Sequence, residues 1–341
     1  MTTPAASRLL AAVLLAASVP AAAAAGQRTS ATPPPSDATW YARYVEGRQG
    51  PAGTDRITRD IRVGRDGALD LQNLSGDVRV TGGSGDVIRI EAVKRVRGRD
   101  RDNADLLESL RVDISQVGDR VEVRTQYPRT RGNISASVDY TITVPTGVAV
   151  AVKTVSGDLQ VTDVRGEVRA ETVSGDVDLS GTPNLAIAKS VSGDVTARDI
   201  GAQTSLELGT VSGNLRATGL KVRALDAGSV SGNLELENLT VERLEAKSVS
   251  GNVLFTGALA KGGRYEFTSH SGDVRLRLAD ETGFELEANS FSGSIRSDLP
   301  ITVRPGDEGR GRNRSIRGSY GDASAILAIR TFSGTVVIAR Q

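Results

Sequence analysis

Apolar and polar residues alternate along most of the chain, and a Ser-Gly pair followed by Asp or Asn interrupts this alternation at regular intervals. Between Ser156 and Ser292 the serines follow one another at steps of 18 to 21 residues. We number each repeat from this serine, which is position 0. The serines at position 0 are Ser75, Ser156, Ser174, Ser192, Ser212, Ser231, Ser250, Ser271, Ser292 and Ser333.

The same kinds of residue return at the same positions of each repeat. From the Ser156 repeat onward, positions −6, −4 and +3 are apolar and position −2 always carries a hydroxyl group. Alternation with a period of two residues indicates a β-strand with one buried face. Glycine tolerates the positive φ of a tight bend, and an adjacent Asp or Asn can bond the local backbone. Each repeat is therefore predicted to form a strand, a bend and a second strand.

A repeat of about 19 residues cannot bury its apolar face alone, whereas copies stacked at ~4.8 Å form a continuous core. We therefore predict an all-β fold, a single-stranded β-solenoid built from ~19-residue Ser-Gly-Asp/Asn repeats. An array of antiparallel hairpins that turn at each Ser-Gly pair fits the same columns and is the alternative. Only the solenoid predicts parallel pairing between successive repeats.

Two long gaps separate the outer repeats from the regular ones. Ser75 lies 81 residues before Ser156, a gap that could hold about four degenerate coils, and 41 residues separate Ser292 from Ser333. In the first gap, Ala104 to Arg111 (ADLLESLR) has helical spacing of its leucines, with Asn103 placed to cap the start.

The chain divides by composition into four segments. Residues 1–25 have one charge, Arg8, before an apolar run and a small-residue tail, which is typical of a signal peptide. Residues 26–55 form a Pro-rich linker and N-terminal cap, 56–147 the degenerate β-repeats, and 148–341 the regular solenoid repeats with an Arg/Gly-rich loop at 304–322. No later segment has the 18 or so apolar residues of a membrane span. We expect an exported protein, periplasmic or extracellular, that does not span the membrane.

The amino-acid composition excludes several kinds of site and partner. The chain has no cysteine, which excludes disulfides, thiolate metal sites and a lipidated cysteine anchor. It carries 42 Lys and Arg against 41 Asp and Glu, so the two balance once Arg8 is removed with the signal peptide. Such a balance argues against a general affinity for nucleic acid.

His270 is the only histidine, so a catalytic triad or a multi-histidine metal site would have to form around it. It occupies position −1, where the other repeats from Ser156 onward carry Val or Phe. We interpret it as a packing substitution.

The acidic column at position +2 is a candidate for calcium, since Asp158, Asp176 and Asp194 would stack ~5 Å apart and Ca²⁺ prefers oxygen ligands. Exposed carboxylates at this spacing repel one another by only about 1 kcal/mol, and later repeats carry Asn instead. We therefore expect no metal and no other cofactor.

Two segments could contact a ligand. The arginine-rich loop offers Arg310, Arg312, Arg314 and Arg317 to phosphate or carboxylate groups, unless it is only a flexible insertion. Trp40 and Tyr41 follow the Pro-rich linker and could stack against a sugar ring or cap the first coil.

Several stretches, among them NLSGDVRVTG, DRVEVRTQYP and LAIRTFSGTVVIAR, resemble the bacterial putative adhesin family, a domain of unknown function made of β-strand repeats. The resemblance covers about Thr58 to Gln341. It implies an envelope or surface protein with a right-handed, parallel β-helix-like body and no established catalytic residues.

We therefore expect a non-enzymatic exported protein of the cell envelope, an adhesin or binding scaffold, whose partner is an envelope polymer, a glycan or an envelope protein. Two alternatives stay open. A carbohydrate-active β-helix enzyme would need paired carboxylates or a basic cluster in a groove, whereas acidic residues here recur singly by column. A structural or stress-signalling module would bind another envelope protein.

Overall fold

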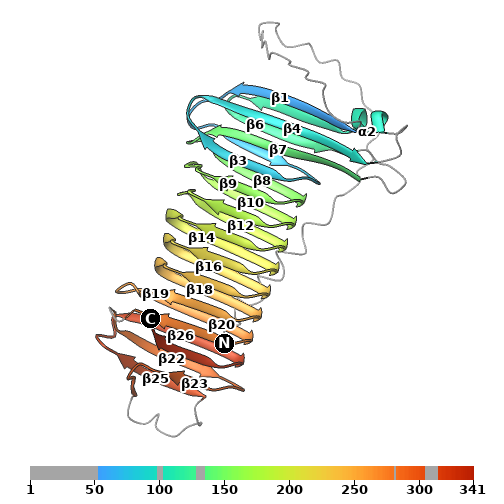
Figure 1. The fold of residues 1–341 in the computed structure, drawn as a ribbon. Coiled ribbons are helices and arrows are strands. Elements are labelled where there is room, and N and C mark those ends of the chain that lie inside the picture. Colours follow the sequence, from blue (N-terminus) through green and yellow to red (C-terminus); the bar gives the residue numbers. More distant parts are fainter. Residues whose placement is uncertain (1–52, 98–102, 128–134, 280–281, 304–313) are drawn as a thin grey trace, which may run out of the picture. The chain divides into compact units, whose positions relative to one another are not determined.

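A computed structural model describes residues 53–97, 103–127, 135–279, 282–303 and 314–341, all within the compact unit Ala42–Gln341. These residues form two long, mostly parallel β-sheets of 13 and 14 strands and one short helix (Figure 1). The predicted all-β class is confirmed. No helix in these ranges is long and apolar enough to cross a lipid bilayer.

The two strands of each regular repeat lie in different sheets. The strand before each Ser-Gly pair belongs to the 14-stranded sheet: β8 (Ala149–Ser156), β10 (Val168–Ser174), β12 (Leu185–Ser192), β14 (Gly201–Ser212), β16 (Lys221–Ser231), β18 (Thr240–Ser250) and β20 (Arg264–Ser271). The strand after it belongs to the 13-stranded sheet: β9 (Leu159–Thr162), β11 (Val177–Ser180), β13 (Val195–Arg198), β15 (Leu215–Thr218), β17 (Leu234–Glu237), β19 (Val253–Gly257) and β21 (Val274–Leu278).

Successive repeats pair in parallel and in register. Ser156 lies opposite Ser174, and Ser174 opposite Ser192, so the position-0 serines form one column. The hairpin alternative is wrong for these repeats, because the strands that flank a turn do not pair with each other. Parallel stacking is the arrangement that the repeated columns predicted.

The core fills the space between the two sheets. Positions −4 and +3 are buried in every repeat from Ser156 onward, for example Val152, Leu159 and Phe267 at no more than 1% exposure. Position −6 is buried too, except at Ala186, where a register shift brings Leu185 inward instead.

The position −2 hydroxyls are buried, and four of them donate a hydrogen bond to a glycine carbonyl of the adjacent turn. Ser190 Oγ donates to the carbonyl of Gly175 at 2.9 Å, and Thr210 Oγ1 to that of Gly193 at 2.9 Å. Ser229 and Ser290 make the equivalent bond at 3.3 and 3.2 Å. These four hydroxyls therefore tie one turn to the next, whereas the buried hydroxyls of Thr154, Thr172, Ser248, Ser269 and Thr331 have no hydrogen-bond partner among the described residues.

The glycine at position +1 is required because stacked turns approach one another closely. A Cβ atom on Gly193 would lie 2.0 Å from the carbonyl oxygen of Gly175, and one on Gly175 would lie 2.1 Å from that of Gly157. Gly157 and Gly175 also have φ of 128° and 144°. The positive φ predicted for the bend is confirmed, and close backbone contact is a second reason for glycine.

The Asp or Asn at position +2 links the turns through its side chain. Asp158 Oδ1 accepts the backbone N–H of Asp176 at 2.9 Å, and Asp176 Oδ1 accepts that of Asp194 at 2.8 Å. Later repeats make the same bond with an Asn oxygen, so only a short side chain with a carbonyl-type oxygen is needed. The acceptors run in the order Asp139, Asp77, Asp158, Asp176, Asp194, Asn214, Asn233, Asn252 and Asp273.

The Ser75 repeat lies directly against the Ser156 repeat. Its strands β2 (Ala68–Gln72) and β3 (Val78–Gly83) pair in parallel with β8 and β9. The prediction of about four coils between these repeats is therefore wrong, because the described strands between β3 and β8 lie on the other side of the Ser75 repeat.

This insertion adds one parallel layer and then antiparallel strands. β6 (Arg120–Gln126) and β7 (Ser135–Pro145) pair in parallel with β2 and β3. Antiparallel strands β5 (Arg111–Val117) and β4 (Val87–Arg97) follow outward, and β1 (Thr54–Arg62), which precedes the Ser75 repeat in the chain, pairs with β4. The predicted helix is present as α2 (Asn103–Ser109). Antiparallel strands therefore form both sheet edges at this end.

At the other end, the repeats do not stack in sequence order. The last repeat, β26 (Ala325–Ser333) and β27 (Val336–Arg340), lies between the Ser271 repeat and the Ser292 repeat, which consists of β22 (Phe284–Ser290) and β23 (Ile295–Ser297). β25 (Ser315–Tyr320) pairs antiparallel with β22, and β24 (Thr302–Val303) with β25. The 41-residue gap thus contains an edge hairpin and a return of the chain into the stack.

Gly193→Ala is expected to lower the free energy of unfolding by about 3 kcal/mol, because the new methyl group meets the Gly175 carbonyl. Gly201→Ala is the matched control, since a Cβ there meets nothing within 4 Å. Urea denaturation of both variants measures the difference. Equal stability of the two would contradict the close-contact explanation.

Cysteine pairs can test the order of the last repeats, because the chain has no cysteine of its own. Ser271 lies opposite Ser333, at the ~4.8 Å strand spacing that a disulfide can bridge, whereas two spacings, ~9.6 Å, are too far. Ser271→Cys with Ser333→Cys should crosslink on mild oxidation, and Ser271→Cys with Ser292→Cys should not. The reverse result, read by mass spectrometry, would show stacking in sequence order.

Candidate functional site

The position −1 side chains form an exposed apolar column beside the turns. Val155, Val173 and Val249 are 43%, 42% and 46% exposed. We call this column, together with the position-0 serines, the turn ridge; in spatial order its position −1 residues are Leu74, Val155, Val173, Val191, Val211, Val230, Val249, His270, Phe332 and Phe291. His270 stacks on Phe332, as a packing substitution would, but it does so at the exposed surface rather than in the core.

Three aromatic rings end the turn ridge. His270 stacks on Phe332 with ring centroids 4.8 Å apart and planes at 11°, and Phe332 stacks on Phe291 at 4.7 Å and 9°. Phe291 belongs to the last repeat of the spatial order and is 68% exposed. No described aromatic ring stacks on its other face, which leaves that face exposed among the described residues.

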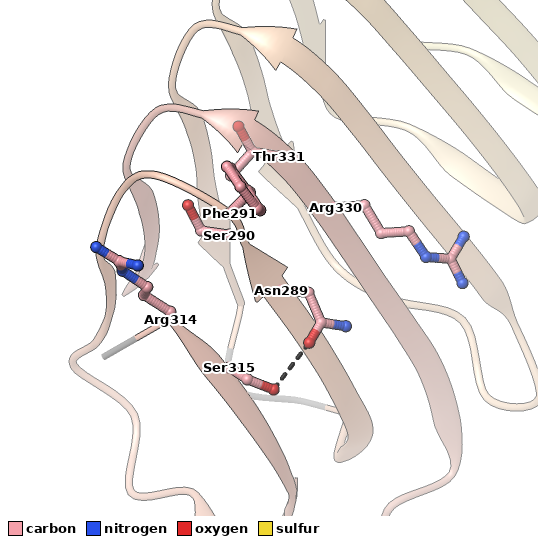
Figure 2. A pocket seen from close by; sticks show the side chains of 7 residues that line it. All are labelled: Asn289, Ser290, Phe291, Arg314, Ser315, Arg330 and Thr331. Atoms are coloured by element: carbon pink, nitrogen blue, oxygen red, sulfur yellow. Dashed lines mark hydrogen bonds between the residues drawn. The ribbon is translucent and has the colours of Figure 1, made fainter. Parts of the chain in front are cut away.

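A shallow surface hollow of about 470 Å³ adjoins Phe291. Its lining comes from three neighbouring strands and the residues at their ends (Figure 2): Asn289, Ser290, Phe291, Arg314, Ser315, Arg330 and Thr331. Arg314 and Arg330 lie on opposite sides of the Asn289–Ser315 pair (Figure 2).

The polar groups of this hollow differ in how far they are already paired. Arg330 forms an ion pair with Glu266 at 2.6 Å, and Ser315 Oγ donates to Asn289 Oδ1 at 2.8 Å. The guanidinium group of Arg314 has no partner among the described residues, and neither has the amide nitrogen of Asn289. The groups left for a ligand are therefore a cation and an amide N–H donor.

The arginines that the sequence offered as ligand contacts lie in different surroundings in the structure. Arg314 lines the hollow, whereas Arg317, three residues later, pairs with Glu287 at 3.0 Å. Arg310, Arg312, Trp40 and Tyr41 lie outside the described residues. The sequence reasoning missed Asn289, Phe291 and Arg330. The replacement of Val by His or Phe at position −1 of the last three repeats was a usable signal.

The acidic +2 column has a structural explanation. Asp77, Asp158 and Asp176 each accept a backbone N–H of the next turn with one oxygen, so the residue type is needed whether or not a cation binds. Within the described ranges, no group of three His, Asp or Glu side chains is arranged to hold a metal ion.

A second hollow, of about 420 Å³, lies on the outer face of the 14-stranded sheet and contains Asp226. Asp226 is in register with Glu207 and Glu245, which pair with Lys189 and Lys247. Burial, and then the charges of Glu245 and Glu207, raise the pKa of Asp226, while the two lysines lower it. Its charged form is therefore disfavoured in the folded protein.

Asp226→Asn should raise the melting temperature slightly at pH 7. A carboxyl whose pKa is higher in the folded state destabilises that state when ionised, and this loss disappears below the unfolded value of 3.8. The advantage of the variant should therefore vanish near pH 3. Glu242→Gln, at a 74% exposed side chain, is the control and should change little at either pH. An advantage that persists at pH 3 would contradict this assignment.

Comparison with known proteins gives a family match over part of the chain. Residues 182–339, a little under half of the chain, match the model of the family described as Toastrack DUF4097. No curated protein matches the chain.

The solved structures that match this chain include a putative adhesin from Bacteroides fragilis, at 14% identity and a TM-score of 0.42, covering 83% of this chain and 96% of that one. A putative lipid binding protein from Parabacteroides distasonis has 8% identity and a TM-score of 0.40 over 83% and 96% of the two chains. A putative adhesin from Parabacteroides merdae has 11% identity and a TM-score of 0.35 over 87% and 100%. The predicted resemblance to a putative adhesin family, a domain of unknown function, is confirmed, with residues 182–339 carrying the Toastrack match.

Proposed function

We propose that this protein is an exported, non-enzymatic binding scaffold of the bacterial cell envelope, and that the turn ridge is its binding surface. The exposed apolar column of the ridge is the observation that carries the proposal. Apolar side chains that are contiguous on a surface mark interaction sites more often than scattered ones do. Here Val155, Val173, Val230 and Val249 all exceed 38% exposure in one column.

The scaffold in this proposal is a right-handed β-solenoid with one repeat of about 19 residues per coil. The parallel, in-register pairing of β8, β10 and β12 supports a coil of this length. Residues 148–341 would form the regular coils and 56–147 the N-terminal β-repeats. Residues 1–25 would direct export, and 26–55 would link and cap.

The turn ridge presents the same groups at regular intervals, so it can contact a partner that is itself made of repeating units. Each repeat offers one apolar side chain and one serine hydroxyl at the strand spacing of ~4.8 Å. Many weak and equivalent contacts of this kind sum to useful affinity when the partner is itself a chain of similar units. We therefore favour an envelope polymer or glycan as the partner over a single folded protein.

Co-sedimentation of the protein with isolated cell-wall polymer and with membrane vesicles tests this function. A variant that combines Val173→Ser, Val230→Ser and Val249→Ser removes apolar surface at three exposed ridge positions. Binding to one of the two preparations should be saturable and survive moderate salt for the unchanged protein, and should weaken at least tenfold for this variant.

The control for the ridge variant changes the outer face of the other sheet. Gln160→Ser, Thr196→Ser and Leu254→Ser lie on strands β9, β13 and β19 and should leave binding unchanged. Equal losses in both variants, or no binding of the unchanged protein to either preparation, would contradict the proposal. Melting temperatures of both variants establish that they are folded.

A further inference from the structure

We propose that the hollow beside Phe291 is a subsite for a saccharide unit that carries a carboxylate, such as a uronic acid residue. This inference rests on the proposed function and adds the chemical class of the ligand at the end of the turn ridge. Three features of the hollow support it: the exposed ring face of Phe291, the unpaired donors around it, and the absence of an acidic side chain among the described lining residues.

Phe291 provides a platform for a flat apolar ring face. One of its faces is covered by Phe332 at a centroid distance of 4.7 Å, and the stack continues to His270. The ring is thus held at a fixed angle although its side chain is 68% exposed. A pyranose ring placed on the open face would extend the stack by one member.

The uncommitted polar groups of the hollow are donors. Ser315 Oγ already donates to Asn289 Oδ1, which leaves the Asn289 amide nitrogen free to donate to a ligand. The Arg314 guanidinium group has no described partner, whereas Arg330 is neutralised by Glu266. A ligand that fits must therefore supply acceptors and a negative charge, which the ring and hydroxyl oxygens and the carboxylate of a sugar acid do.

Carboxylate matches the site better than the phosphate of a lipid or a phosphodiester polymer does. A guanidinium group forms two-bond pairs with carboxylate and with phosphate alike, so the ring platform, and not Arg314, separates the two ligand classes. A glycerol phosphate unit has no ring face to stack on Phe291, so the aromatic platform would gain nothing from it. The combination of a ring platform with one cation therefore favours a carboxylated sugar.

Calorimetric titration of the full chain with trigalacturonic acid and with its methyl ester tests the inference, because esterification removes the charge and keeps the rings. The acid should bind at least about tenfold more tightly than the ester. Phe291→Ala should weaken binding of the acid about tenfold by removing the platform. Arg314→Gln should weaken binding of the acid about tenfold and that of the ester less than about twofold.

Arg317→Gln is the matched control, because Arg317 follows closely on Arg314 but pairs with Glu287. It should leave the affinity for the acid unchanged. Equal binding of acid and ester, no binding of either, an equal loss with Arg317→Gln, or tighter binding to phosphatidylglycerol vesicles would overturn the inference. If these tests fail while the chain still co-sediments with envelope material, the subsite is wrong and the scaffold function stands. Failure of co-sedimentation counts against the scaffold function itself.

Discussion

Each turn rests directly on the backbone of the turn before it, and the strand spacing of both sheets depends on this contact. Glycine at position +1 leaves no atom between one turn and the carbonyl of the next, as at Gly193 over Gly175. The +2 side chain then bonds across the same gap, and either Asp or Asn serves because only an acceptor oxygen is used. Exchange to Asn in the middle of the stack also lowers the repulsion between neighbouring carboxylates.

The repeat columns were enough to predict the strands, the buried positions and the parallel stacking, and the leucine spacing of Ala104 to Arg111 was enough to predict α2, because each follows from local spacing and burial. The order of the repeats could not be predicted in the same way. Leu286 and Leu327 occupy the same column, and either could lie in register with Tyr265. Because these repeats are interchangeable in the columns, the connecting segments decide their stacking order. The edge hairpin of β24 and β25 leads the chain back, so that β26 lies beside β20.

The candidate site was harder to predict because a column of Val and Phe at position −1 looks the same in the sequence whether its side chains are buried or exposed. Positions −6, −4 and −2 face the core, so position −1 falls on the opposite face of the same strand. The phase of the alternation therefore already placed Val173 and His270 outside. Arg314 was identifiable as a cation, but its separation from Arg317 depends on pairing with Glu287, which residue type alone does not reveal.

The stacking order decides which ring ends the turn ridge. Each position −1 side chain inside the turn ridge has a neighbour on both sides. Only the ring at the end of the aromatic stack can therefore offer a free face. Had the repeats stacked in sequence order, Phe332 would have been last and Phe291 would have lain between it and His270. Because β26 enters the stack before β22, Phe291 is last, and β22 is also the strand that pairs with β25. That pairing brings Arg314 and Ser315 to the same end, so the platform and the free cation meet because of the return of the chain.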